Sequence, residues 1–197
     1  DEQVWKERLV LAVFFYSTGG NQWRESNKWM TSKDHSSWRG VWTDSSTNYV
    51  LDLDQFYNKL TGYIPSEIAA LTSLQRLDLY ENDITGPIPS EIAALASLTY
   101  LDLDENDLSG PIPPEIGALA SLTSLYLGDN DLSGPIPPEI GALTSLTFFL
   151  LYGNDLTGPI PSEIAALTSL ADLELSGGNK LTGPIPSEIA GCPHLSD

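Results

Sequence analysis

Gly86-Pro87-Ile88-Pro89-Ser90-Glu91-Ile92 begins a unit that returns at Gly110, Gly134, Gly158 and Gly183, with a variant at Gly62. Successive units are 24 residues apart, except for the last step of 25. Each unit reads G-x-I-P-x-E-I-x-x-L-x-x-L-x-x-L-x-L-x-x-N-x-L-[ST]. A fixed period of this length predicts a solenoid, in which each unit buries its apolar side against its neighbours.

The leucine spacing within a unit predicts a short strand. In Leu77-Asp78-Leu79, alternation sends both leucines inward and the aspartate outward, and stacking of these strands makes a parallel sheet. An asparagine recurs where the chain leaves each strand, and its amide can satisfy backbone groups that the turn leaves unpaired. We expect a structural ladder at Asn82, Asn106, Asn130, Asn154 and Asn179.

The recurring Pro-x-Glu-Ile segments predict the start of a helical turn. Proline suits the first turn of a helix, and glutamate there is favoured by the helix dipole. A structural role is therefore expected for the recurring glutamates, which are Glu67, Glu91, Glu115, Glu139, Glu163 and Glu188.

Residues 50–197 resemble the plant-type leucine-rich repeats of receptor-like kinase ectodomains and polygalacturonase-inhibiting proteins, whose units read L-x-G-x-I-P. Residues 1–49 resemble the cap that precedes such repeats, with a helix around Val4 to Tyr16 and the element Trp38-Arg39-Gly40-Val41. The resemblance implies an α/β solenoid: a right-handed superhelix with a parallel concave β-sheet, short helical or 3-10 turns on the convex side and an N-terminal helical cap. It is specific for fold and says little about function.

The cap departs from the plant pattern because Ser36 and Thr43 stand where cysteines are typical. It is more similar to the cysteine-free caps of algal and bacterial surface proteins. Burial of large aromatic side chains is expected to hold it instead, and packing is favoured over a carbohydrate platform. The aromatic residues are Trp5, Phe14, Phe15, Trp23, Trp29, Trp38 and Trp42.

The formal net charge is −18, and it is unevenly distributed. After residue 60 only Arg76 and Lys180 oppose nineteen acids. Nucleic acid is disfavoured as a partner, because such binding needs Lys and Arg to neutralise phosphates. The acidity favours a cationic partner, a divalent metal ion or a high-salt milieu, or it serves solubility alone. No apolar stretch approaches the roughly 18–20 residues of a membrane helix, so no span is expected.

Nothing in the sequence predicts an enzyme. The two histidines, His35 and His194, are not placed to serve a nucleophile, and with the single cysteine they make no zinc pattern. No phosphate-binding glycine loop is present, so no cofactor is predicted. Cys192 aligns with leucines of earlier repeats and reads as a buried hydrophobe, or alternatively as half of a disulfide. A paired-carboxylate hydrolase is a remote alternative.

Outward strand positions vary between repeats, whereas the leucines do not. A surface adapted to recognise a ligand would show this variation, and so would neutral drift of exposed positions. Phe148, Leu150, Tyr126 and Tyr152 are expected to form one exposed apolar cluster, a feature that often marks an interaction site. The full predicted binding face is Asp78, Tyr80, Tyr100, Asp102, Asp104, Tyr126, Phe148, Leu150, Tyr152, Asp172 and Glu174.

An aspartate follows the ladder asparagine in four repeats, at Asp83, Asp107, Asp131 and Asp155. Strands stacked ~4.8 Å apart would align these charges, and each neighbouring pair would repel by roughly 1 kcal/mol in water. Weak calcium binding would relieve the repulsion, whereas side chains that splay into solvent need no ion.

Three classes of function follow. The first is an extracellular or cell-surface module that recognises a protein, peptide or polysaccharide, cationic or partly apolar, through its acidic, aromatic-bearing concave face. The second is a structural or adhesive repeat protein of a surface or matrix, with or without calcium; the third, remote, is an ice-binding protein or hydrolase. A secreted or cell-surface location is implied by the resemblance only, since no N-x-[ST] glycosylation motif is present. Self-association through the end of the solenoid is a further expectation.

Overall fold

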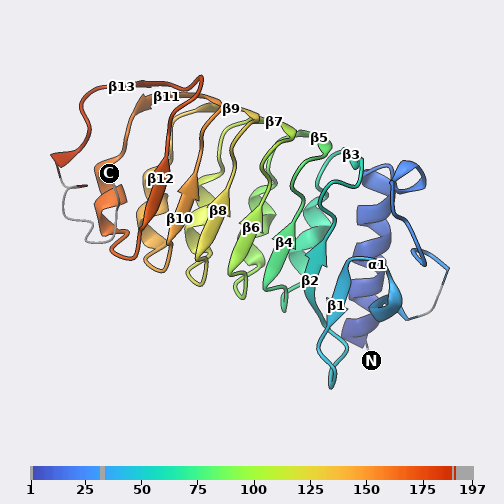
Figure 1. Cartoon of the computed structure of the whole chain (residues 1–197). Coiled ribbons are helices and arrows are strands. Elements are labelled where there is room, and N and C mark those ends of the chain that lie inside the picture. The colour runs from blue at the N-terminus through green and yellow to red at the C-terminus, as the bar shows by residue number, and fades with distance from the viewer. Residues whose placement is uncertain (1, 32–33, 188, 190–197) are drawn as a thin grey trace.

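The computed structural model describes residues 2–31, 34–187 and 189. Its repeats are stacked in a row, and each contributes a strand to one sheet, a 3-10 helix on the opposite side and a strand along one edge (Figure 1). The predicted α/β solenoid is confirmed. The expectations for Glu188, Cys192 and His194 concern residues outside the described part.

The main sheet contains the leucine strands. Its strands are parallel from β2 onward and pair leucine with leucine, as Leu77 does with Leu101, except that Phe149 takes the leucine position in β10. Strand β1 is antiparallel to β2 and joins the cap to the sheet. In order, they are β1 (Val41–Thr43), β2 (Val50–Asp54), β4 (Arg76–Asp78), β6 (Tyr100–Asp102), β8 (Ser124–Tyr126), β10 (Phe148–Leu150) and β12 (Asp172–Glu174).

A second sheet, which was not predicted, follows the ladder asparagines. Four of its strands, β5, β7, β9 and β11, begin with an exposed aspartate, a buried leucine or isoleucine and a hydroxyl residue. This period of two is the signal that the sequence carries. They are β3 (Thr61–Gly62), β5 (Asp83–Gly86), β7 (Asp107–Gly110), β9 (Asp131–Gly134), β11 (Asp155–Pro159) and β13 (Lys180–Thr182).

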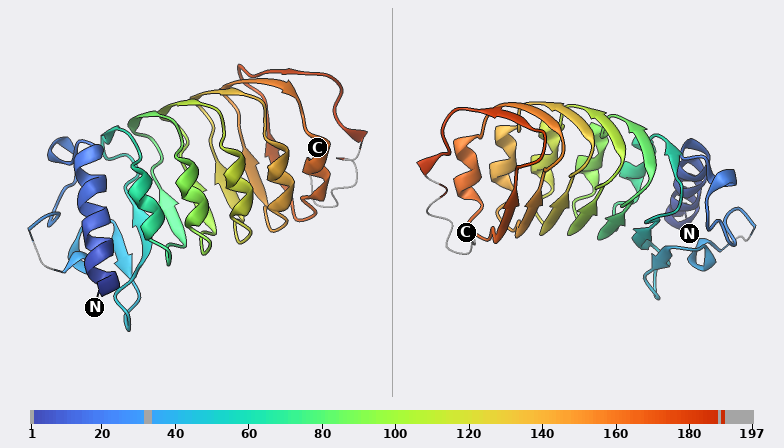
Figure 2. Two further views of the ribbon diagram at one scale, coloured as in Figure 1. Left: turned by 180° about the vertical axis from the view of Figure 1, so that it is seen from behind. Right: turned by 45° about the horizontal axis from the view of Figure 1, so that its top comes forward.

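The Pro-x-Glu-Ile segments form 3-10 helices, as predicted. Each follows a proline in extended conformation and places its glutamate in the first turn. Seen from behind, these helices stand in one row with the cap helix at its end (Figure 2). The helices are α1 (Glu2–Ser17), η1 (Gly20–Gln22), η2 (His35–Ser37), η3 (Ser66–Ala70), η4 (Ser90–Ala94), η5 (Pro114–Ala118), η6 (Pro138–Ala142) and η7 (Ser162–Ala166).

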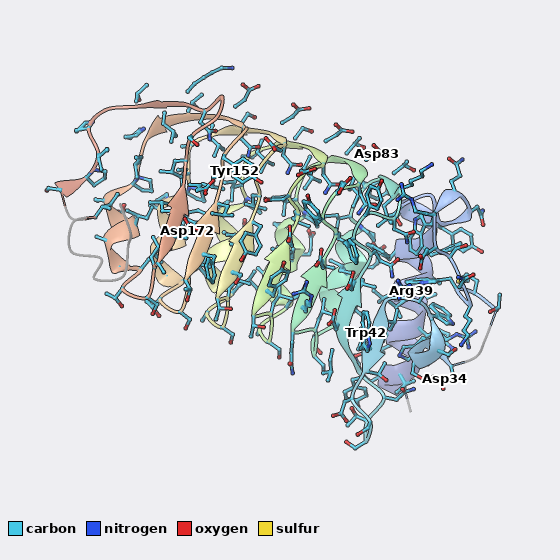
Figure 3. The ribbon with its side chains drawn as sticks, in the orientation of Figure 1. Asp34, Arg39, Trp42, Asp83, Tyr152 and Asp172 are labelled. Atoms are coloured by element: carbon cyan, nitrogen blue, oxygen red, sulfur yellow. The ribbon has the colours of Figure 1, made fainter. Side chains whose placement is uncertain are left out.

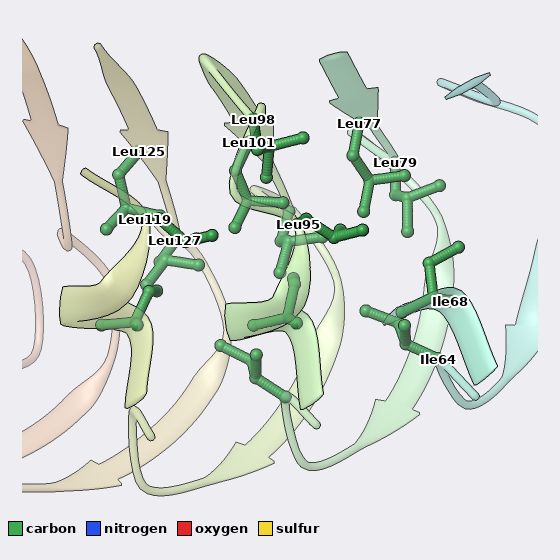
Figure 4. Close-up of a cluster of buried hydrophobic side chains, with 14 of the residues drawn as sticks. Ile64, Ile68, Leu77, Leu79, Leu95, Leu98, Leu101, Leu119, Leu125 and Leu127 are labelled. Atoms are coloured by element: carbon green, nitrogen blue, oxygen red, sulfur yellow. The ribbon is translucent and has the colours of Figure 1, made fainter. Parts of the chain in front are cut away.

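The core is one continuous stack of leucine and isoleucine side chains (Figure 4). Leu77 enters it from β4, Leu79 from the residue after that strand and Ile68 from a 3-10 helix, and all three are fully buried. Asn106 shows how the ladder joins repeats: its Nδ2 donates to the carbonyl of Leu79, and its Oδ1 accepts from the amide of Ile84, 3.1 Å away. The predicted structural role of the asparagines is confirmed.

Aromatic packing holds the cap, but two of the seven residues that were predicted to be buried are exposed. The Trp23 and Trp29 rings are 4.8 Å apart, and both side chains are buried. Trp5 and Trp42, in contrast, are 64% and 49% exposed, so the expectation that they are buried was wrong. Trp5 lies away from the buried side of α1, and strand alternation directs Val41 inward and Trp42 outward.

A buried carboxylate also ties the cap to the repeats. Oε2 of Glu7, on α1, accepts a 2.8 Å hydrogen bond from the amide of Val50 at the start of β2. Both residues are fully buried. Within the described residues, no helix has the length and apolar character needed to cross a membrane.

Candidate functional site

The outer face of the main sheet carries the predicted binding residues in columns. Strand register places Phe148 between Ser124 and Asp172, and Leu150 between Tyr126 and Glu174. In the side-chain view, Trp42 lies at the cap end of this sheet and Tyr152 and Asp172 lie toward the later strands (Figure 3). The columns follow from the parallel pairing of equivalent positions.

Three neighbouring rings come from three successive strands, and we call Tyr100, Tyr126 and Phe148 the aromatic row. The ring centroids of Tyr100 and Tyr126 are 5.5 Å apart, and those of Tyr126 and Phe148 are 6.4 Å apart. The guanidinium carbon of Arg76 lies 3.7 Å from the Tyr100 centroid, at cation–π distance. Phe148, at the far end, is 40% exposed and offers the most open apolar surface of the row.

The predicted four-member apolar cluster is only partly correct. Tyr126 contacts Phe148 and is paired in register with Leu150, as expected. Tyr152 instead lies over Gly128, where an added Cβ would come within 2.5 Å of its ring. Its hydroxyl donates to Oδ2 of Asp104, and this hydrogen bond turns the ring toward the earlier repeats.

Three of the predicted contact residues are buried rather than open to a ligand. Asp78, Asp102 and Asp104 are 6%, 9% and 6% exposed. Asp78 forms an ion pair with Arg76, and Asp102 accepts a 2.8 Å hydrogen bond from the hydroxyl of Tyr100. Long neighbouring side chains cover these short ones, so the aspartates orient the aromatic and arginine side chains of the face.

Burial also changes the acidity of this face. It raises the pKa of Asp102 to about 6, against the opposing hydrogen bond from Tyr100. Burial likewise raises the pKa of Asp52 to about 6, although Arg76 lowers it. The hydrogen bond from Tyr80 to the carboxylate of Glu105 raises the pKa of Tyr80 to about 12. Between pH 5 and 7, the charge at the N-terminal end of the sheet therefore depends on pH.

The predicted set of binding residues left out two residues of this face, although strand alternation places Arg76 on it. Arg76 joins Asp78 to the Tyr100 ring, and Asp52 precedes it in the same column. The signal was available, because the same leucine alternation that selects Tyr100 also selects Arg76. Arg76 stands out as a basic residue in a repeat region with nineteen acids.

The four aspartates of the second sheet are exposed, but they do not stand directly opposite one another. Asp107 pairs with Thr85 and Asp131 with Ser109, so successive aspartates are displaced by two residues along the strands. This stagger corrects the expected alignment at ~4.8 Å and increases the separation to roughly 8 Å. Asp155 has a basic partner, because Nζ of Lys180 lies 2.6 Å from its Oδ1.

Calcium binding to these aspartates stays a prediction. Across residues 2–31, 34–187 and 189, no group of three or more His, Cys, Asp and Glu side chains is arranged to hold a metal ion. The stagger already relieves part of the repulsion that would have favoured an ion.

Family models agree with the geometry of the repeats. Two leucine-rich-repeat models match the chain, one over residues 49–108 and one over residues 121–143 and 145–167. The solved ectodomain of BIR2 from Arabidopsis thaliana is 33% identical, with a TM-score of 0.78, and the match covers 90% of this chain and 95% of that one. The chain belongs to the leucine-rich-repeat family. Comparison with curated proteins by sequence gave no significant match.

Other leucine-rich-repeat ectodomains of Arabidopsis receptor kinases superpose as well. That of GASSHO1/SCHENGEN3, solved in complex with CASPARIAN STRIP INTEGRITY FACTOR 2, is 34% identical with a TM-score of 0.86 over 96% of this chain. That of HAESA, solved with an IDA peptide hormone, is 29% identical with a TM-score of 0.84 over 99% of this chain. This leucine-rich-repeat chain spans 23% and 33% of those two ectodomains.

Proposed function

We propose that this leucine-rich-repeat chain is an extracellular or cell-surface recognition module, and that it binds a protein or peptide through the outer face of the main sheet. The aromatic row carries the proposal, since a line of partly exposed rings on a rigid sheet is suited to bury apolar side chains of a ligand. Supporting it, the similar ectodomains of GASSHO1/SCHENGEN3 and HAESA were solved with bound ligands.

The neighbouring charges indicate the ligand's character. Asp172 lies beside Phe148 and Glu174 beside Leu150 on the adjacent strand, and Glu174 is exposed. Unlike Asp102, neither of these acids is buried. A ligand segment with an apolar residue followed by Lys or Arg would match the row and these carboxylates together. The face therefore favours a cationic, partly apolar peptide.

A peptide-display selection on the immobilised chain tests this proposal. We expect enriched peptides to combine apolar and basic residues, and to lose binding to the double variant Phe148→Ser, Leu150→Ser. Tyr63→Ser is a matched control, because Tyr63 is 57% exposed and lies outside the main sheet. A selection that enriches nothing, or whose peptides bind the double variant as well as the parent, would contradict the assignment.

Two alternative functions predict different experimental results. A structural or adhesive protein would associate with itself through the ends of the solenoid, and sedimentation of the Phe148→Ser, Leu150→Ser variant would show assembly undiminished. A polysaccharide ligand on the aromatic row would be displaced by neutral sugar and not by peptide. Binding rather than catalysis is favoured, since the three buried acids of the face already have partners. Asp78 pairs with Arg76, Asp102 accepts from Tyr100, and Asp104 accepts from Tyr152.

A further inference from the structure

A cavity of about 380 Å³ lies where the cap meets the first repeat. Three parts of the chain line it: residues 24–25 of the cap loop, residues 39–40 together with Trp42 of β1, and residues 54–58 at the end of β2. Its volume falls in the range of small-molecule sites, roughly 300–1,000 Å³. We call it the cap pocket, and no feature of the proposed peptide face involves it.

Exposed aromatic side chains line the cap pocket. Trp42, Phe56 and Tyr57 are 49%, 52% and 46% exposed. These large side chains therefore leave apolar surface open to solvent beside the pocket. At the position of Tyr57 the next two repeats have Glu81 and Glu105, so the aromatic residue is particular to this end of the solenoid. Adjoining exposed rings around a hollow, unlike scattered single ones, indicate a binding site.

The charges of the cap pocket are balanced, in a protein of net charge −18. Arg24 and Arg39 contribute two guanidiniums, and Glu25 and Asp54 contribute two carboxylates. Nε of Arg39 lies 2.6 Å from Oε2 of Glu25, while Arg24 lies over the ring of Tyr57, 3.6 Å from its centroid. A pocket for a charged ligand would have an excess of side chains of the opposite charge. Paired donors and acceptors instead match a neutral ligand that both donates and accepts hydrogen bonds.

Buried amides hold the walls of the cap pocket in place. Asn58, which is 4% exposed, accepts from the amide of Glu25 at 2.6 Å and donates to Oε1 of Gln55 at 2.7 Å. Gln55 in turn donates to the carbonyl of Arg39, 2.7 Å away. Asn58 has the sequence position of a ladder asparagine, but its side chain ties down the cap loop. The pocket is thus formed before a ligand arrives, which lowers the entropic cost of binding.

We propose that the cap pocket binds a neutral saccharide. The C–H-rich face of a sugar ring packs on an aromatic ring, whose face carries partial negative charge, and Trp42 offers such a surface. Hydroxyl groups donate to Asp54 and accept from the arginine side chains. The ligand class follows from the combination of open rings with balanced donors and acceptors, and the site is independent of the proposed peptide face.

Titration with cellotetraose, laminaritetraose and mannotetraose, followed by calorimetry and tryptophan fluorescence, tests the proposal. We expect at least one of these sugars to bind with a Kd on the order of 0.1–1 mM, a range typical of small, open sites. Because the ligand is neutral, moderate salt should leave the affinity unchanged.

Trp42→Ala should weaken this binding about tenfold or more, a change of roughly 1.4 kcal/mol. Trp5→Ala is the matched control, since Trp5 is 64% exposed on α1, away from the pocket. This variant should bind the sugar as tightly as the parent does. Should Trp42→Ala fail to fold, Phe56→Ala at the same pocket replaces it. Lack of binding by all three sugars at about 10 mM overturns the proposal. So does equal binding by the pocket variant, or binding only of a charged oligosaccharide or a peptide at this pocket.

Discussion

The hydroxyl of Tyr152 donates a 2.9 Å hydrogen bond to Oδ2 of Asp104, which lies 48 residues earlier in the chain. Gly128 occupies the equivalent position in the repeat between them, and its amide donates to Oδ1 of the same aspartate. The ring can lie over Gly128 only because that residue has no side chain. Three successive repeats are thereby joined on the outer face of the main sheet.

Tyr152→Phe should therefore reduce stability. The change removes one of the partners of a buried carboxylate, and the expected loss is about 1–2 kcal/mol in the free energy of unfolding measured with urea. Tyr80→Phe is the control, because its hydroxyl bonds to Glu105, an exposed side chain, and a smaller loss is expected. Equal losses in the two variants would argue against the joining role of Asp104.

Asp102→Asn should change how stability depends on pH. Burial raises the pKa of Asp102 to about 6 in the folded protein, so the folded state binds this proton more tightly than the unfolded state does. The stability gained in this way is fully present below the unfolded pKa near 4 and is lost as pH rises through about 6. From pH 7 to pH 5, the parent should gain about 1 kcal/mol that the variant lacks.

Comparing the two unfolding curves isolates this effect. His35, whose pKa burial lowers, opposes it: its stabilising contribution is lost as pH falls below about 6.5. That loss is the same in both proteins and cancels in the difference between them. Parallel pH profiles for parent and Asp102→Asn would show that Asp102 is not desolvated in the folded protein.

Glu7→Ala should loosen the cap. The change leaves the buried amide of Val50 without its acceptor, at an expected cost of about 1–3 kcal/mol. Glu2→Ala, which removes a solvent-exposed partner of Lys6 on the same helix, should leave the melting temperature unchanged. A Glu7→Ala protein that melts with the parent would mean that aromatic packing alone secures the cap.

Calcium should have little effect on the melting temperature. The aspartates of the second sheet are staggered, and Asp155 already pairs with Lys180. We expect no shift at millimolar calcium by differential scanning fluorimetry, in the parent or in Asp107→Asn. A rise in the parent that Asp107→Asn abolishes would establish a binding site in spite of the stagger.

Periodicity predicted most of the fold, because the leucines and asparagines serve the same contact in every repeat. Leu77 and Asn106 were placed correctly for that reason. The second sheet was missed although its alternation is visible, since its strands are short and follow a turn. Trp42 was misplaced because its environment depends on how β1 pairs with β2, a long-range relation that composition does not contain.

The candidate site was harder to predict, for a related reason. Strand alternation identified the columns, but it could not show which long side chains lie over the short ones. Asp102 and Asp104 were expected at the surface and are covered, because Tyr100 and Tyr152 reach across to them. Alternation also placed Arg76 on this face, but only the structure shows its contacts with Asp78 and the Tyr100 ring.

Strands β2, β4, β6, β8 and β10 pair in the same way, so the distance along the solenoid grows by one strand spacing with each repeat. Four strand spacings separate β2, beside the cap pocket, from Phe148 on β10, and at ~4.8 Å each they amount to roughly 19 Å. Inserting or deleting one 24-residue unit between them would shift this span by a single spacing and leave both ends chemically intact. A ligand that engages both places at once would thus bind only when the number of repeats between them matches the ligand's length.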